Sequence, residues 1–175
     1  MKFRFQIETK ANIFKIVAPY GSKMAKEKQC LGWREWVTLP QWNIKKIKAK
    51  LDTGARTSAL HAEDVEIISK GNKTKVRFRV CPRQNSKKRT KTVTANLLGW
   101  RLVRSSTGTV TERPVVVTEL KIGEQSWPIE VTLVNRDIMG FRMLIGRQAL
   151  RRRFVIDPGR SFLAKKPSLS LIEST

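Results

Sequence analysis

The most informative segment of the sequence is Ala49-Lys50-Leu51-Asp52-Thr53-Gly54-Ala55. It ends the strand-like run 44–51 with a carboxylate, a small hydroxyl residue and a glycine, in the order expected at a tight turn. A carboxylate held there can face a catalytic water, as acid–base hydrolysis of a peptide bond requires. Gly54 lets backbone and substrate approach closely, and Thr53 can hydrogen-bond within the loop. Asp-Thr-Gly is also ordinary turn chemistry after a strand, so a purely structural role stays open.

The rest of the sequence is dominated by short strand-like segments. Alternating or continuous apolar patterns predict strands at residues 33–37, 44–51, 76–80, 115–117, 129–134 and 154–156. Residues 115–117 and 129–134 flank a turn around Gly123 and indicate a hairpin. Only residues 147–153 favour a helix, and we expect one short helix near residues 147–152. Many short strands with one short helix predict an all-β domain, either a barrel or a sandwich.

A second apolar segment ends in a Gly-Arg pair. Met143-Leu144-Ile145-Gly146-Arg147 is an apolar run that closes on Gly-Arg and enters the expected helix. Residues 100–111, with Ser105 and Ser106 near their centre, are typical of a hairpin with a flexible tip.

The chain has 175 residues, of which 40% are hydrophobic, enough for one ordinary domain. No apolar run is long enough to cross a bilayer, and the N-terminus does not resemble a secretory signal. The two cysteines do not form a disulfide framework. These features predict a cytoplasmic protein with reduced thiols. We expect a basic N-terminal extension at 1–31, a folded domain at 32–164 and a tail at 165–175.

Charge is the most unusual feature of the composition. Lys and Arg number 36 and Asp and Glu 14, which gives a net charge of +22. Such a field attracts polyanions, so the candidate partners are nucleic acid, the ribosome, an anionic membrane surface or an acidic polypeptide. A solvated basic surface that only aids solubility is the alternative, although the excess exceeds what solubility needs.

The sequence resembles a known family of proteins. It is similar to the bacterial retropepsin-like aspartic peptidases labelled "ATP-dependent zinc protease" and associated with RimK-type ligases. The matching segments are Gly32-Trp33-Arg34-Glu35-Trp36, Leu39-Pro40, residues 48–62, Val103-Arg104-Ser105-Ser106, Asn135-Arg136-Asp137-Ile138-Met139 and residues 143–147. The resemblance covers about residues 32–164.

The resemblance implies a closed acid-protease barrel and an aspartic-type endopeptidase (a hydrolase). It implies that Asp52, Thr53 and Gly54 form the catalytic loop, beside the Gly-Arg segment and under a hairpin flap. Substrate would then contact Ala55, Arg56, Arg147, Ser105 and Ser106. It also implies a substrate: members are thought to trim glutamates that the ligase adds to a ribosomal protein.

Two departures from the family pattern and its label bear on chemistry. Retroviral members have an acid four residues after the catalytic Asp, which pairs with the Gly-Arg arginine. This chain has Arg56 there, so two guanidiniums would favour acidic substrate side chains. Solvent-facing arginines without a role are the alternative. The zinc label finds little support, because His61 is the only histidine, and no phosphate-binding loop is present. We therefore expect no metal and no cofactor, and activity without added metal or ATP.

Catalysis by this route needs two carboxylates that share a proton. The sequence has four aspartates, Asp52, Asp64, Asp137 and Asp157, and only Asp52 lies in Asp-Thr-Gly. A homodimer that brings two copies of Asp52 together is the economical solution. We expect Asp137 to pair with nearby arginines.

Three function classes remain open from the sequence. The first is a peptidase for acidic or polyglutamate-tailed substrates, including a ribosomal protein by resemblance. The second is a nucleic-acid- or ribosome-binding module on a protease-like barrel without catalysis, which the five tryptophans would suit. The third is a catalytically idle dimerisation domain. No membrane partner is expected.

Overall fold

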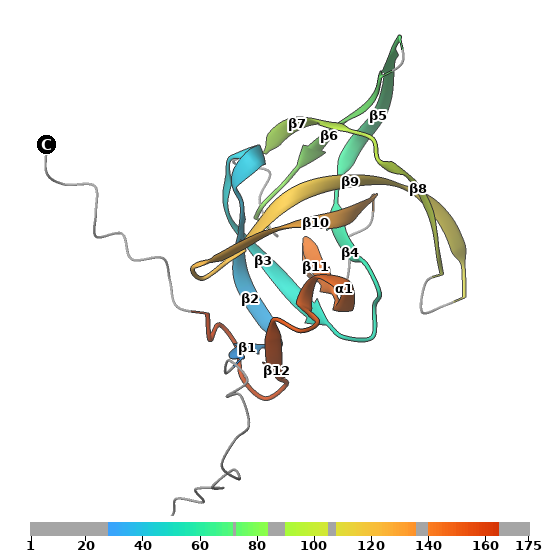
Figure 1. Cartoon of the computed structure of the whole chain (residues 1–175). Helices are drawn as coiled ribbons and strands as arrows, with labels where there is room; N and C mark the ends of the chain where they lie inside the picture. The colour runs from blue at the N-terminus through green and yellow to red at the C-terminus, as the bar shows by residue number, and fades with distance from the viewer. Residues whose placement is uncertain (1–27, 72, 84–89, 105–107, 136–139, 165–175) are drawn as a thin grey trace, which may run out of the picture.

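The computed structural model describes residues 28–164, except 72, 84–89, 105–107 and 136–139. Nearly all of the regular secondary structure in the part described is β-strand (Figure 1). The strands are β1 (Gln29–Gly32), β2 (Arg34–Leu39), β3 (Ile44–Asp52), β4 (Ser58–His61), β5 (Glu63–Lys70), β6 (Lys73–Val80), β7 (Lys91–Asn96), β8 (Gly99–Arg104), β9 (Val110–Ile122), β10 (Gln125–Val134), β11 (Met143–Gly146) and β12 (Phe154–Asp157). One 3-10 turn, η1 (Pro40–Trp42), and one short helix, α1 (Arg147–Leu150), complete it.

The main sheet closes on itself. Its strand order is β10-β4-β11-β3-β2-β9-β8, and β10 also pairs with β9. That second pairing joins β10, β4, β11, β3, β2 and β9 into a ring and leaves β8 outside it, on the far edge of β9. β11 lies between β3, to which it runs parallel, and β4, to which it runs antiparallel. The ends of β3 and β11 therefore meet, and this is where Asp52 lies.

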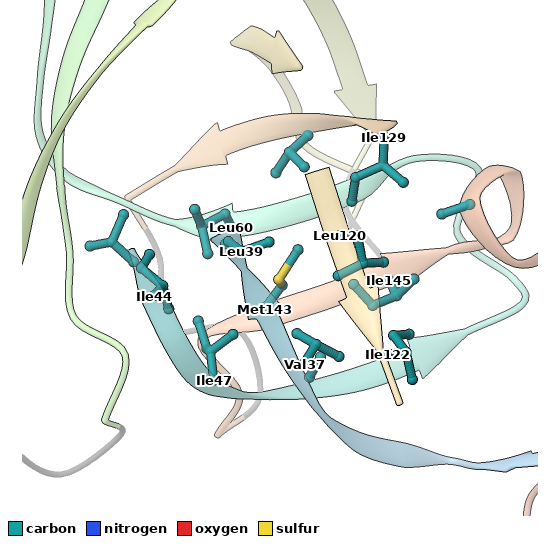
Figure 2. Packing of buried hydrophobic residues seen from close by; sticks show 14 of the residues in the cluster. Val37, Leu39, Ile44, Ile47, Leu60, Leu120, Ile122, Ile129, Met143 and Ile145 are labelled. Atoms are coloured by element: carbon teal, nitrogen blue, oxygen red, sulfur yellow. The ribbon is translucent and has the colours of Figure 1, made fainter. Parts of the chain in front are cut away.

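Alternation along the strands places the apolar side chains inside the ring. In β3, Ile47, Ala49 and Leu51 are buried, whereas Lys48 and Lys50 between them are half-buried. Figure 2 shows Ile47, Leu60, Leu120, Met143 and Ile145 packed together from different strands. Each of these five side chains is fully buried. The core therefore fixes the position of β3 and β11, and through them the position of the loop after Asp52.

A second sheet of three strands, β5-β6-β7, extends from the ring (Figure 1). Its central strand β6 buries Val76, Phe78 and Val80, and Trp42 packs edge-on against Phe78. The outer strands are more exposed and carry many charged and polar side chains. Because the middle strand alone has a clean apolar face, it anchors its two neighbours to the core.

The all-β prediction is confirmed, and most of the predicted strands are present. The hairpin around Gly123 is formed by β9 and β10, which are longer than predicted. The helix is shorter than expected and ends at Leu150, because Arg151 takes ψ 141° and Arg152 takes φ 66°. β1 begins at Gln29, inside the segment 1–31 that the sequence suggested as an extension. The tail 165–175 and residues 1–27 lie outside the described residues.

One buried carboxylate ties the end of the described chain to its beginning. Glu35 is 1% exposed, and its Oε1 accepts hydrogen bonds from the amides of Gly32 (2.7 Å) and Leu163 (2.8 Å). Its Oε2 accepts a third, from the amide of Ala164, at 3.2 Å. Through these hydrogen bonds, Glu35 holds residues 163 and 164 against the corner between β1 and β2. At this corner Gly32 lies so close to the backbone of Arg160 that a residue with a Cβ would clash.

We expect Glu35→Ala to lower the free energy of unfolding by about 3 kcal/mol, because three buried amides lose a charged acceptor. Glu35→Gln is the matched control. It keeps one carbonyl oxygen for the Gly32 and Leu163 amides and should cost only about 1 kcal/mol. Urea denaturation followed by tryptophan fluorescence measures both. Equal stability of Glu35→Ala and the wild type would show that the three hydrogen bonds to Glu35 contribute nothing to the free energy of unfolding.

Candidate active site

The loop after β3 holds the Asp52 carboxylate by backbone amides. Asp52 Oδ1 accepts hydrogen bonds from the amides of Gly54 and Ala55, each at 3.0 Å. This local ring is the Asx-type turn that Asp forms readily when glycine follows closely. The side chain of Asp52 is half-buried. The carboxylate therefore has a fixed orientation and stays within reach of solvent.

The segment Gly146-Arg147, where β11 ends and α1 begins, contacts this loop. Gly146 pairs in register with Asp52 across the parallel β3–β11 pair. The Arg147 amide donates to the Ala55 carbonyl at 2.7 Å, and its guanidinium Nη1 donates to the Thr53 carbonyl at 2.9 Å. These two hydrogen bonds fix the loop that follows β3 to the start of α1. The two predicted motifs, almost a hundred residues apart in sequence, thus form one unit.

Ser58 is a supporting residue that the sequence interpretation did not identify. It is 2% exposed, and its Oγ accepts a hydrogen bond from the Gly146 amide at 3.2 Å. A Cβ built on Gly146 would lie 2.4 Å from the carbonyl carbon of Thr57 and 2.9 Å from the Ser58 amide nitrogen. Glycine is needed here because two backbones touch, and no property of either segment alone reveals that contact.

The two arginines of the site have different roles. Arg147 donates to the Thr53 carbonyl instead of the acid that retroviral relatives carry. The carbonyl of Arg56 accepts from the Gln148 amide at 3.0 Å, and its side chain is exposed. Arg56 is therefore held by its backbone beside the loop that follows β3, with its side chain at the surface. A negatively charged ligand at this loop would meet both positive charges.

The predicted flap corresponds to the β8–β9 hairpin, which projects from the ring (Figure 1). Its pairing runs from Gly99↔Val115 to Arg104↔Val110. Trp100 and Leu102 lie on its exposed side. Ser105 and Ser106, predicted to contact substrate, lie outside the described residues, as does Asp137.

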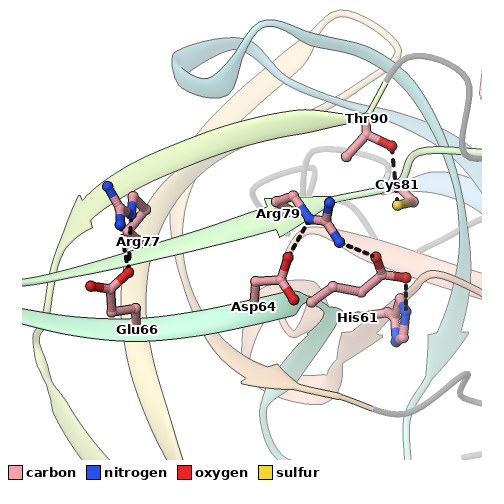
Figure 3. A network of polar contacts seen from close by, with 8 residues as sticks. His61, Asp64, Glu66, Arg77, Arg79, Cys81 and Thr90 are labelled. Atoms are coloured by element: carbon pink, nitrogen blue, oxygen red, sulfur yellow. Dashed lines mark hydrogen bonds and ion pairs between the residues drawn. The ribbon is translucent and has the colours of Figure 1, made fainter.

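His61 lies in a charged cluster at the start of β5 (Figure 3). It is 6% exposed, and its Nε2 lies 3.6 Å from Glu63 Oε1. Arg79 bridges onward to Glu63 at 3.2 Å and to Asp64 at 2.6 Å. Within the described residues, no three His, Cys, Asp or Glu side chains are grouped as metal ligands. Both cysteines are free thiols, Cys30 exposed and Cys81 buried.

Two of the cavities at the surface of the described residues are lined by basic side chains. The larger, about 800 Å³, lies beside the first half of β3 and is lined by six basic residues together with Trp36. The smaller, about 430 Å³, lies between β10 and α1 and includes Thr57, Ser58 and Gln148. Arg83, Lys91 and Arg142 line the larger cavity, whereas Arg151 and Arg153 line the smaller one. No helix in the described residues is long and apolar enough to cross a membrane.

Several known proteins resemble this chain in sequence. Two curated relatives, each named a probable alpha-L-glutamate ligase, match the chain. One, from Shewanella halifaxensis, is 36% identical over 79% of this chain and 30% of the relative. The other, from Parasynechococcus marenigrum, is 41% identical over 73% of this chain and 28% of the relative. The chain therefore spans about a third of the length of the curated relatives it matches.

A solved structure shows the same fold. The crystal structure of a Legionella pneumophila protein of unknown function matches with a TM-score of 0.65 at 29% identity, covering 79% of this chain and all of that one. The family model for the retropepsin-like aspartic endopeptidase RimB matches residues 30–167, which include both motifs of the site. This chain belongs to the RimB-like family of retropepsin-like aspartic endopeptidases.

Proposed function

We propose that this protein is an aspartic-type endopeptidase that works as a homodimer and cuts acidic or polyglutamate-tailed proteins. The observation that carries the proposal is the braced Asp52 carboxylate, held by two amides and gripped by Gly146-Arg147. Preorganised catalytic groups of this kind do not have to be ordered during the reaction. The two free thiols support a reducing compartment, the cytoplasm.

In the proposed mechanism, the two Asp52 carboxylates share one proton across a two-fold axis. The ionised carboxylate takes a proton from a water molecule, whose oxygen attacks the peptide carbonyl carbon. The protonated carboxylate gives its proton to the departing amide nitrogen as the carbon–nitrogen bond breaks. A second Asp-Thr-Gly does not occur in the sequence. Each chain therefore supplies half of the dyad, and activity should depend on pH in a bell shape.

Two observations support an acidic substrate. Arg56 and Arg147 place two guanidiniums at the catalytic loop, in a chain of net charge +22. Relatives whose matching segment is about a third of their length are named as probable glutamate ligases. A chemistry that adds glutamate thus occurs in one polypeptide with a segment like this chain, which supports removal of glutamate as its counterpart. A ribosomal protein is the substrate we propose.

The test compares matched peptides that carry a run of Glu or a run of Gln. We expect kcat/KM to favour the Glu peptide by more than about tenfold at low salt, and the preference to shrink as salt screens the charges. Mass spectrometry of the products identifies the bond cut. Equal rates on both peptides at every salt concentration would contradict an acidic specificity, and no cleavage of either would contradict the peptidase.

We expect Arg56→Ala to lower kcat/KM for the Glu peptide by about fivefold, because an exposed ion pair contributes up to about 1 kcal/mol. The Gln peptide should be affected much less. Lys75→Ala on β6 is the control, because it removes one positive charge from the second sheet. An equal loss of kcat/KM on both peptides would mean that Arg56 supports the structure of the loop and does not recognise the charge of the substrate.

A nucleic-acid- or ribosome-binding module without catalysis is the second candidate. The observation that favours it is the large basic cavity beside β3. Binding of single-stranded RNA that falls steeply with salt, together with no peptide cleavage, would favour this reading.

A further inference from the structure

We propose that the outward face of β3 is a track for an acidic polypeptide, which leads from the basic cavity to Asp52. The inference rests on the proposed function and adds to it a binding site outside the catalytic loop. The track consists of Lys46, Lys48 and Lys50. Its occupant is an acidic segment longer than the few residues that the catalytic loop can hold.

The pleat of β3 determines which of its side chains share the outer face of the strand. Successive side chains of a strand point to opposite faces, and Ile47, Ala49 and Leu51 point into the core. The side chains of the three track lysines therefore share the outer face, and the same alternation places Asp52 next in the row. A cationic residue stands at every second position leading to the proposed catalytic carboxylate.

The neighbouring strands add positive charge on both sides of this row. On β2, Arg34 pairs with Lys50 and Trp36 with Lys48. On the other side, Arg142 directly precedes Met143, the residue of β11 that pairs with Ala49. The row is thus flanked by an arginine on each side.

The far end of the track opens into the cavity of about 800 Å³. The cationic residues that line it come from three separate segments: Lys45, Lys46, Lys48, Arg83, Lys91 and Arg142. Among the described residues that line it, none is Asp or Glu. Six positive charges gathered around one cavity repel one another, and an anionic occupant relieves that repulsion.

Aromatic rings hold several of these cations in place. Lys46 Nζ lies 4.1 Å from the centre of the Trp36 ring, and Lys48 Nζ lies 5.0 Å from that of Phe141. Phe162 stacks on Trp36 at 5.4 Å with nearly parallel planes. Cations ordered by such contacts lose less freedom when they bind an anion.

The same contacts favour a polypeptide over RNA as the occupant. Sequence-tolerant binding of single strands relies on aromatic faces that stack bases. Among the described residues that line the cavity, Trp36 is the one aromatic residue, and its ring already contacts Phe162 and Lys46. The site offers charge without a free stacking surface, which suits a chain of carboxylates.

The geometry sets a minimum length for the occupant. Lys46 and Asp52 are six residues apart on β3, which corresponds to about 20 Å at about 3.3 Å per residue. An extended peptide with the same rise needs about six residues to span that distance. A run of four glutamates can occupy the catalytic loop or the track, whereas a run of twelve can occupy both.

The experiment measures binding, separately from catalysis, in the Asp52→Asn background. Fluorescein-labelled peptides with four or twelve glutamates are titrated by fluorescence anisotropy at low salt. We expect Lys46→Gln/Lys48→Gln to weaken binding of the twelve-residue run about tenfold and that of the four-residue run less than about twofold, because two exposed charge pairs are lost. The control Lys73→Gln/Lys75→Gln removes the same charge from β6 and should change neither.

Three results would overturn the track. These are equal effects of the two double variants, equal effects on the two peptide lengths, and tighter binding of a twelve-residue oligouridine than of the twelve-residue glutamate run. A failure of the proposed function is separate from these results. It would leave the length-dependent binding intact while the enzyme with Asp52 cuts neither peptide.

Discussion

Asp52→Asn is expected to reduce peptide cleavage by about 10³- to 10⁴-fold, because the amide can neither accept the proton of the water nor return it to the leaving nitrogen. The substitution preserves size and keeps one oxygen for the amides of Gly54 and Ala55. The loop and the fold should therefore survive. Steady-state cleavage of the Glu peptide, with circular dichroism as the check on folding, measures the effect. Activity within a few-fold of the wild type would remove Asp52 from the mechanism.

Mixing the variant with the wild type tests the dimer. If each active unit contains two copies of Asp52, an Asp52→Asn chain inactivates every wild-type chain that it pairs with. An equal mixture that exchanges subunits then keeps about a quarter of its dimers active, whereas independent monomers would keep about half active. Wild-type chain at constant concentration should lose activity as variant is added. Unchanged activity at every ratio would show that one chain suffices.

Gly146→Ala is expected to be the most destabilising conservative change in the site. Its methyl group would lie 2.4 Å from the Thr57 carbonyl carbon, within backbone that cannot rotate away. Forcing atoms into a packed contact costs about 3 kcal/mol or more, which corresponds to a fall in Tm of about 10 °C for a domain of this size. Because Gly146 pairs with Asp52, activity should fall as well, even below the new Tm.

Gly159→Ala is the control for this prediction. A Cβ there would lie 3.4 Å from Asp157 Oδ1, an ordinary contact with a side chain. Differential scanning calorimetry should show a change of less than about 2 °C. A Tm of Gly146→Ala equal to that of the control would mean that β11 can shift away from Thr57 at little cost.

The sequence predicted those parts of the fold that local patterns determine. Val76-Arg77-Phe78-Arg79-Val80 alternates cleanly, and β6 is present with its apolar side chains buried. Its neighbours β5 and β7 were not predicted, because they are largely polar and become strands by pairing with β6. The helix was predicted too long, since the backbone turns at Arg151 and Arg152 despite good helix-forming side chains.

Local patterns predict only part of the candidate site. The family resemblance implied that the Asp52 loop lies beside the Gly-Arg segment, and the structure pairs Gly146 with Asp52. Periodicity alone does not predict this pairing, because it says nothing about which distant strand a strand will join. The same limit hid Ser58, whose hydroxyl matters only because the Gly146 amide reaches it. His61 lies close to Glu63 across the corner between β4 and β5. The direction that the backbone takes at this corner brings the two side chains together, and the sequence pattern does not predict that direction.

The pairing of β11 with β3 has a consequence for how the protein is made. Arg147 and Thr53, which share a hydrogen bond, are 94 residues apart in the chain. Contacts between such distant residues form late in folding, since a long loop must close before they contribute. During synthesis Asp52 leaves the ribosome long before Gly146 exists. A nascent chain therefore carries its candidate catalytic aspartate before the Gly146-Arg147 segment exists, and the loop gains the hydrogen bond to Arg147 only after that segment has been synthesised.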